Sequence, residues 1–480
     1  MSGAVSVVPL IFVPLLAAFF AFVFPRQGRF AVLGTVLTMP PLLIMAIMEL
    51  VHQGPLRHPV GGWGMPLGID LYMDGLTAFM LLTTCVICCF TLVYAKHYFD
   101  QGNESRFFWP LGLLLWTALN ALFLAADIFN LYVTLELLGL TAVALTALTG
   151  QRASLNAALR YLFVGLLASG GYLLGVALLY GGYGLLDLQM LASTLRAEPV
   201  SYIALVMMTV ALLTKSALFP FHFWLPPAHA NAAAPVSALL SALVVKASFY
   251  MLLRLWFQLF PDIITPLAAN LIGGLGAAAI LWGSLQALRQ IRIKLMVAYS
   301  TVAQLGYLFL VFPLAAAGQT EAAIYGVLYL VLAHACAKSA MFLGTGTVMH
   351  AAGHDRMDEI QGLAKHMPVT VFTFALAGIS LMGLPPSGGF VAKWSLLVAA
   401  MESGQWGWAI ILLTGSLLAA AYLFKLLSPT LLQRGVGGEI ADERQWPAMI
   451  WPAFLLALIA VALGFFSPLF FDLIAIGMVQ

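Results

Sequence analysis

Five lysines lie inside stretches of the chain that are otherwise apolar enough to cross a bilayer: Lys215, Lys246, Lys338, Lys393 and Lys425. A charge at the centre of a membrane costs about 2.5 to 3.5 kcal/mol even on a permissive insertion scale, so each lysine needs a reason to be there. Lysine can release its proton when it is desolvated or beside another cation, whereas arginine in effect cannot. No arginine is placed as deep as these lysines. The pattern indicates proton transfer between buried bases.

One glutamate is placed as centrally as the lysines. Glu136 lies about nine residues into its apolar stretch, which is roughly 13 Å at the helical rise of 1.5 Å per residue. A Glu–Lys pair that opens and closes would switch the proton affinity of the lysine. A fixed structural partner for one buried lysine is the alternative. For Lys215 and Lys246, too, a structural ion pair stays open.

Histidines accompany the lysines. His334 and Lys338 are four residues apart and therefore share a helix face, where each would lower the proton affinity of the other. His222 and His229 lie around a proline-rich stretch, and they are either water-bridged relay groups or ordinary loop histidines. Lys425 is near the end of its apolar stretch, so we expect its long side chain to reach the membrane surface.

The composition restricts the class of protein. Of 480 residues, 62% are hydrophobic and 8% are charged, whereas a soluble domain carries about a quarter charged residues. We expect an all-α integral membrane protein.

A net charge of +2 argues against a nucleic-acid partner, and Cys85, Cys88 and Cys89 are interpreted as packing residues of one helix. No spacing of ligands suggests an Fe–S cluster, haem or metal, so no cofactor is expected. The N-terminus has no basic region and no cleavage site, which indicates a first membrane helix and not a removed signal.

Apolar runs long enough to span a bilayer predict 14 transmembrane helices. They start near residues 5, 30, 73, 107, 128, 155, 199, 235, 267, 294, 321, 368, 407 and 447. Loops after odd-numbered helices contain 13 basic residues, whereas loops after even-numbered helices contain Arg57 and Arg196, with Arg254 near a helix end, so both termini should face outward. The 13 are Arg26, Arg29, Lys96, Arg106, Arg152, Arg160, Arg289, Arg292, Lys294, Arg356, Lys365, Arg434 and Arg444.

Two of the predicted helices are interrupted by prolines, the seventh in 215–227 and the twelfth in 383–393. Interrupted helices at corresponding places indicate inverted repeats with a hydrated cavity beside each break. The predicted parts are 1–106 (helices 1–3), 107–260 (first five-helix repeat, helices 4–8), 261–430 (second repeat, helices 9–13) and 431–480 (helix 14). The acidic residues Glu439, Asp442 and Glu443 are expected in a solvated loop.

Several segments carry a resemblance that covers roughly residues 70–430. The chain resembles the antiporter-like membrane subunits of respiratory complex I and of Mrp-type cation/proton antiporters. Gln304 before Leu-Gly-Tyr, and the lack of a long C-terminal extension, look most like the Mrp D-like subunit. The segments are 127–136, 215–246, 289–294, 298–307 and 384–393, with Leu-Pro-Pro-Ala-His at 225–229 as the most specific.

The resemblance implies a role for each relay residue. Glu136 matches the glutamate that modulates Lys215, and Lys246 matches the connecting lysine. His334 matches the histidine of the eleventh helix, and Lys393 the terminal group. His229 and Lys338 are further candidates from the residue pattern itself.

The expected function is proton translocation as a subunit of a larger complex in a bacterial inner membrane, with other integral subunits as partners. An NADH-quinone oxidoreductase, a membrane-bound hydrogenase or a bicarbonate-uptake complex is the alternative to an Mrp antiporter. The chain is not expected to hold a redox site of its own, although membership of an NADH-quinone oxidoreductase stays open. A quinone-binding subunit, a structural spacer and a stand-alone transporter are alternatives of other classes. Whether sodium is also carried is open.

Overall fold

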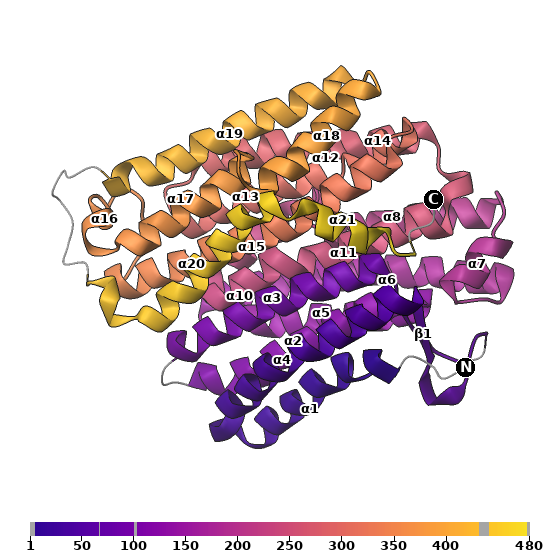
Figure 1. The fold of residues 1–480 in the computed structure, drawn as a ribbon, viewed down its shortest axis with the longest axis horizontal. Helices are drawn as coiled ribbons and strands as arrows, with labels where there is room; N and C mark the ends of the chain where they lie inside the picture. Colours follow the sequence, from indigo (N-terminus) through magenta and orange to yellow (C-terminus); the bar gives the residue numbers. More distant parts are fainter. Residues whose placement is uncertain (1–4, 67, 100–102, 432–440, 478–480) are drawn as a thin grey trace.

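Apolar helices make up most of the computed structural model, which describes residues 5–66, 68–99, 103–431 and 441–477. They lie side by side along the long axis of the molecule, with α1 and α4 on one flank and α19 on the other (Figure 1). The helices of the first half are α1 (Pro9–Val23), α2 (Gly28–Gln53), α3 (Gly75–Tyr98), α4 (Asn103–Leu124), α5 (Ile128–Thr146), α6 (Arg152–Tyr183), α7 (Leu188–Thr194), α8 (Pro199–Lys215), α9 (Leu225–Asn231), α10 (Ala234–Leu239) and α11 (Val245–Arg254). Those of the second half are α12 (Pro266–Arg289), α13 (Ile293–Leu308), α14 (Val311–Ala316), α15 (Thr320–Ala352), α16 (Leu363–His366), α17 (Pro368–Met382), α18 (Gly388–Glu402), α19 (Trp406–Leu431), α20 (Pro447–Ala462) and α21 (Ser467–Ala475).

Eleven helical segments of the described chain are long and apolar enough to cross a membrane. Three further apolar helices, α1, α8 and α17, are shorter. The expectation of a multi-pass helical membrane protein is therefore confirmed, while the count of 14 crossings stays a prediction. The end of the described chain lies against the start of α3, where the backbone N–H of Gly75 donates to the carbonyl oxygen of Ile476 at 2.7 Å.

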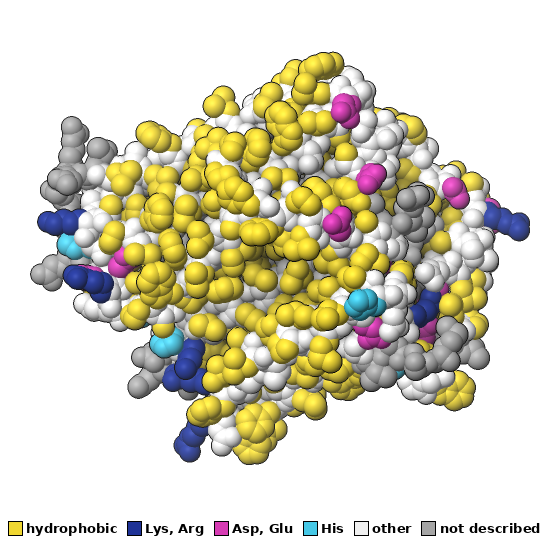
Figure 2. Space-filling view, in the orientation of Figure 1, with side chains coloured by type: hydrophobic (Ala, Val, Ile, Leu, Met, Phe, Trp, Pro, Cys, Tyr) yellow, Lys and Arg dark blue, Asp and Glu magenta, His cyan; other side chains and the backbone are white. Residues whose placement is uncertain are grey.

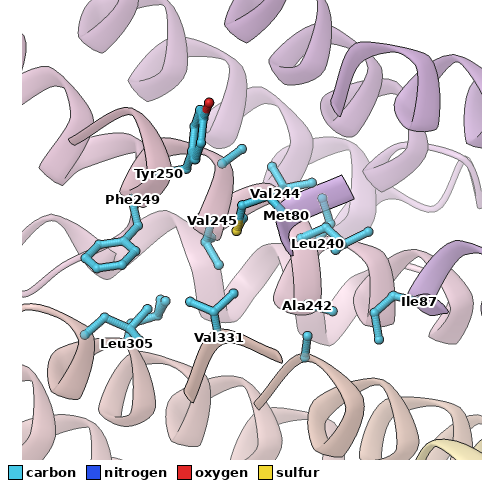
Figure 3. Close-up of a cluster of buried hydrophobic side chains, with 14 of the residues drawn as sticks. Met80, Ile87, Leu240, Ala242, Val244, Val245, Phe249, Tyr250, Leu305 and Val331 are labelled. Carbon is cyan, nitrogen blue, oxygen red and sulfur yellow. The ribbon is translucent and has the colours of Figure 1, made fainter. Parts of the chain in front are cut away.

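Hydrophobic side chains cover the middle of the molecule, and charged side chains gather toward the two ends of its long axis (Figure 2). This distribution is what a bilayer requires, because lipid tails solvate apolar side chains and cannot hydrogen-bond to charged ones. Within each of the spans Ala234–Leu259 and Thr320–Ala352, a stretch of 18 residues is completely buried. Figure 3 shows part of this core, including Met80, Val244, Phe249, Leu305 and Val331.

Both predicted interruptions fall between helices. Helix α8 ends at Lys215, and a 3-10 turn (Phe221–Trp224) leads into α9. Helix α17 ends at Met382, and α18 begins at Gly388. At this second corner a Cβ on Gly389 would lie 1.8 Å from the carbonyl oxygen of Ser380, so only glycine fits. The pairing of the two halves as inverted repeats, and the boundaries at 106, 260 and 430, stay predictions.

The described strands form a hairpin at one end of the bundle. Strand β1 (Leu56–Pro59) pairs antiparallel with β2 (Asp70–Met73), with Leu56 opposite Met73. Arg57 forms ion pairs with Asp70, at 2.6 Å, and with Asp187 at the start of α7. Burial, with a smaller effect of Asp74, raises the pKa of Tyr72 on β2 to about 12.

The structure corrects the interpretation of the acidic loop. Glu443 is buried, and its carboxylate accepts hydrogen bonds from the backbone N–H groups of Val369, at 2.7 Å, and Thr370, at 3.0 Å. These groups open α17, where a helix has free N–H donors and favours a negative charge. Asp442 is in the expected exposed position and pairs with Arg444, and Glu439 lies outside the described residues.

Candidate functional site

Glu136 and Lys215 form an ion pair. The ammonium of Lys215, the last residue of α8, donates to Oε1 of Glu136 on α5 at 2.9 Å. Ser169 on α6 donates to the same oxygen. Helix α5 begins at Ile128 because Asp127 caps it, accepting a hydrogen bond from the backbone N–H of Asn130 at 2.6 Å. Glu136 is therefore held two turns into a helix with a fixed start.

Two glycines leave room beside this pair. A Cβ on Gly139 would lie 3.4 Å from Nζ of Lys215, and one on Gly165 would lie 4.0 Å from it. The cavity lined by Glu136, Lys215 and these glycines has about 10 Å³, which is roughly the room that one water needs. The Glu136 side chain is 19% exposed, so the pair lies at the edge of the bundle and not at its centre.

Lys246 lies at the centre, directly after a π-helical segment. Residues Leu240–Val244 form the π-helix between α10 and α11. Nζ of Lys246 donates to the carbonyl oxygen of Ser241, five residues earlier. Such segments locally change which side chains share a helix face and are frequent at functional sites.

One face of α13 connects Lys246 to Lys338. The hydroxyl groups of Ser241 and Thr301 are 2.9 Å apart, and Thr301 donates to the carbonyl oxygen of Val297 at 3.0 Å. Lys338 on α15 donates to that same carbonyl oxygen at 3.1 Å. Lys246 and Lys338 therefore each contact a residue, Ser241 and Val297 respectively, that Thr301 also contacts.

The same face of α13 continues to Lys393. Lys338 also donates to the hydroxyl of Ser300. One turn further, Nε2 of Gln304 donates to the carbonyl oxygen of Leu381 at 3.1 Å, and Lys393 donates to that oxygen at 2.8 Å. Leu381 is in the last turn of α17, so this contact depends on the helix ending at Met382. In the sequence this part of α13 stands out only by its resemblance, although the spacing of Ser300, Thr301 and Gln304 could have indicated a polar face.

His334 and His229 are buried close to these lysines. His334 is within electrostatic range of Lys246, Lys338 and Lys393, and His229 is within range of Lys246 and Lys338. The His229 ring stacks on Phe342 with the centroids 5.0 Å apart. No described protein group accepts from or donates to the ring nitrogens of either histidine. The structure thus brings His334, Lys246, Lys338 and Lys393 together, with His229 beside them.

Three further basic residues contact carbonyl oxygens or a carboxylate of other segments. Lys294, expected in a loop, is buried, and its Nζ donates to the carbonyl oxygen of Ala232 just after α9. Lys425 extends to the end of α12, where it donates to the carbonyl oxygens of Leu288, at 2.7 Å, and Gln290, at 2.8 Å, and its reach to the membrane surface stays a prediction. A helix C-terminus offers such unpaired carbonyls to a cation.

The third residue, Arg254, is near a helix end as expected, but its side chain is buried. Both of its terminal nitrogens donate to Asp74 at 2.6 Å, and Nε donates to the hydroxyl of Tyr250 at 3.1 Å. Asp74 also caps α3 by accepting from the backbone N–H of Thr77 at 2.9 Å. This bidentate pair ties the helix of Lys246 to the start of α3.

Comparison with known proteins agrees with this architecture. Residues 125–419 match the model of the family described as NADH:quinone oxidoreductase/Mrp antiporter, TM. NADH-quinone oxidoreductase subunit N of Desulforudis audaxviator is 36% identical over 95% of both chains. A Na(+)/H(+) antiporter subunit of Alkalihalophilus pseudofirmus is 27% identical over 87% of this chain and 85% of its own. A chain of the Mrp complex from a Dietzia species superposes with a TM-score of 0.88 at 25% identity, covering 98% of this chain and 96% of that one.

The family match spans more than half of the chain, and it includes every residue of the buried Lys, Glu and His set. The expected resemblance to antiporter-like membrane subunits is confirmed. The chain belongs to the NADH:quinone oxidoreductase/Mrp antiporter transmembrane family.

Proposed function

We propose that this chain translocates protons as one subunit of a multisubunit membrane complex. The observation that carries the proposal is one face of α13 that lies among three buried lysines. Val297 accepts from Lys338, and Thr301 contacts Ser241, to which Lys246 donates. Gln304 and Lys393 donate to the same carbonyl oxygen, that of Leu381. Buried ammonium groups without carboxylate partners are costly, and a membrane protein keeps them where they serve an ion path.

The relay has two parts in this proposal. Protons enter or leave near the Glu136–Lys215 pair, whose charge state depends on whether the pair is closed. They pass along Lys246, Lys338 and His334 to Lys393, with His229 as a side branch. Buried polar atoms almost always have hydrogen-bond partners, so we infer that water molecules satisfy the ring nitrogens of His229 and His334 and complete the path.

Partners follow from the exposed side of the ion pair. A neighbouring subunit against α5 and α6 would reach the cavity beside Glu136 and change the electrostatic field at Lys215. Mrp-type sodium/proton exchange is the function expected from the sequence. Proton pumping in an NADH-quinone oxidoreductase has equal support, since relatives of both kinds match over most of the chain. We also propose a bacterial inner membrane as the location, with both termini outside, from the distribution of the basic residues.

The test is the formation of a pH gradient in membrane vesicles that contain the whole assembly. Sodium and NADH are supplied in turn as the driving force. Lys215→Ala, Glu136→Ala and Lys393→Ala should abolish most of the gradient at verified assembly, and Lys96→Ala, which removes an exposed lysine, should not. Sodium-driven movement would identify the Mrp-type function and NADH-driven movement the oxidoreductase. Undiminished transport in all three assembled variants would refute the relay and favour a structural role for the buried charges.

A further inference from the structure

A groove runs along the outside of the bundle between α1 and α4, two helices that pack against each other. Its volume is about 350 Å³, and its walls are almost entirely apolar. The residues that line it are Leu15, Ala18, Phe19, Phe22, Phe107, Pro110, Leu111 and Leu114. Phe19 and Phe22 are 60% and 68% exposed, so the groove is open to whatever surrounds the bundle.

A second hollow of about 470 Å³ lies beside the next residues of the same two segments, and this one is basic. Its lining continues directly from the first, because Val23 follows Phe22 and Arg106 precedes Phe107. It contains two exposed arginines, Arg26 and Arg106, one from each side. Among the described residues neither has a carboxylate partner, and Arg106 only lies over the ring of Phe107, 5.7 Å from its centroid.

The position of Arg26 is fixed by the packing around it. It belongs to the 3-10 turn Pro25–Gln27 that joins α1 to α2. The next residue after this turn, Gly28, lies so close to Trp109 of α4 that a Cβ would be 2.8 Å from its ring. The turn is therefore pressed against α4, and Arg26 is kept near the start of the helix that carries Arg106.

We propose that this site binds an anionic phospholipid, with its phosphate between Arg26 and Arg106 and one acyl chain in the apolar groove. Arginine is suited to phosphate because its planar donors match the oxygen geometry. From Phe107 to Leu114 the groove extends about 10 Å along α4 at 1.5 Å per residue, within the roughly 15 Å of one hydrocarbon leaflet. Charge and shape thus select the two parts of one ligand at the two ends of one continuous surface.

Charge complementarity also decides between a lipid and a transmembrane helix of a partner. An apolar partner helix would fill the groove but leave two arginines without counter-charge. An anionic lipid satisfies both parts. Both arginines belong to the set of basic residues from which the sequence predicts the inner face, where anionic lipids concentrate in many membranes.

The test measures lipid binding to the complex after it has been purified from membranes. Native mass spectrometry would follow rebinding of phosphatidylglycerol and of phosphatidylcholine with the same acyl chains after delipidation. Each basic residue near a membrane surface favours anionic lipid about five-fold, so Arg26→Gln with Arg106→Gln should lower phosphatidylglycerol binding up to about 30-fold. Arg152→Gln with Arg160→Gln removes two exposed arginines on α6 and should change it less than two-fold.

A second variant tests the acyl-chain groove without changing charge. Leu111→Trp keeps the surface apolar and fills the groove, so it should weaken binding of both lipids about equally. Equal binding of the two lipids by the wild type, or unchanged phosphatidylglycerol binding in the double arginine variant, would overturn the proposal. So would efficient cross-linking of Phe22→Cys to another subunit, because a protein segment would then occupy the groove.

Discussion

The buried pair of Arg254 and Asp74 gives a quantitative prediction. Asp74→Asn keeps the cap of α3, since asparagine accepts the same backbone hydrogen bond, but it removes the charge that faces the guanidinium. The Arg254 and Asp74 side chains are only 9% and 4% exposed, so water cannot replace the lost carboxylate. Removing one partner of a buried pair costs about 3 to 5 kcal/mol. We expect the lower end of this range, because the amide oxygen still accepts one hydrogen bond.

The assay can use the cysteines of the protein itself. Cys85, Cys88 and Cys336 are free and buried, so a thiol-reactive dye reports thermal unfolding of the purified complex. The double variant Asp74→Asn with Arg254→Met removes the uncompensated charge and should recover about 2 kcal/mol relative to Asp74→Asn alone, because replacing both partners of a buried pair is often close to neutral. Proton transport per assembled complex should be retained in all three forms.

Two results would refute this reasoning. Asp74→Asn within about 1 kcal/mol of the wild type would mean that water or lipid headgroups solvate the pair. A double variant less stable than Asp74→Asn would mean that Arg254 stabilises the helix by packing and not by its charge.

The contacts of single residues give three more predictions. Thr301→Val keeps the side-chain shape but removes the hydroxyl between Ser241 and Val297, so transport should fall several-fold, as expected for a lost hydrogen bond of about 1 kcal/mol. The control Thr345→Val, whose hydroxyl bonds only within α15, should transport normally. Equal transport rates in the two variants would exclude the α13 face as a path. Gly389→Ala places a Cβ 1.8 Å from the carbonyl oxygen of Ser380 and should prevent assembly, measured as complex recovered from membranes. The control Gly407→Ala meets nothing within 4 Å and should assemble. Normal recovery of Gly389→Ala would contradict the close packing of α17 on α18. Glu443→Gln should lower the thermal unfolding midpoint, because hydrogen bonds to a charged group contribute about 1.5 to 3 kcal/mol. The control Glu402→Gln changes an exposed glutamate and should leave the midpoint unchanged. An unchanged midpoint in Glu443→Gln would mean that the cap of α17 needs no charge.

The sequence predicted those features that depend on composition and on strong local signals. The apolar runs predicted a helical membrane protein, and the prolines around 220 and 385 predicted where α8 and α17 stop. A buried lysine was expected beside Glu136, because a lone acidic residue in a membrane span needs a counter-charge, and the family resemblance implied that this lysine is Lys215.

What the sequence could not predict depends on contacts between distant segments. Glu443 looks like part of an acidic loop until α17 is placed beside it, and Lys294 looks like a loop cation until the carbonyl of Ala232 is brought within reach. The serine, threonine and glutamine of α13 share one face by their spacing, but the sequence does not show that Lys338 and Lys393 from other helices lie against that helix.

The π-helical segment before Lys246 restricts how this chain can change in evolution. In a regular α-helix, residues five apart point about 140° away from each other, yet Lys246 reaches the carbonyl of Ser241 across Leu240–Val244. Deleting a single residue there would restore an α-helix and turn everything on one side of it by about 100° relative to the other. Loops tolerate changes in length, but here the loss of one codon would separate Lys246 from the carbonyl oxygen of Ser241 without changing either residue. Substitutions can therefore accumulate in this segment far more readily than changes in its length.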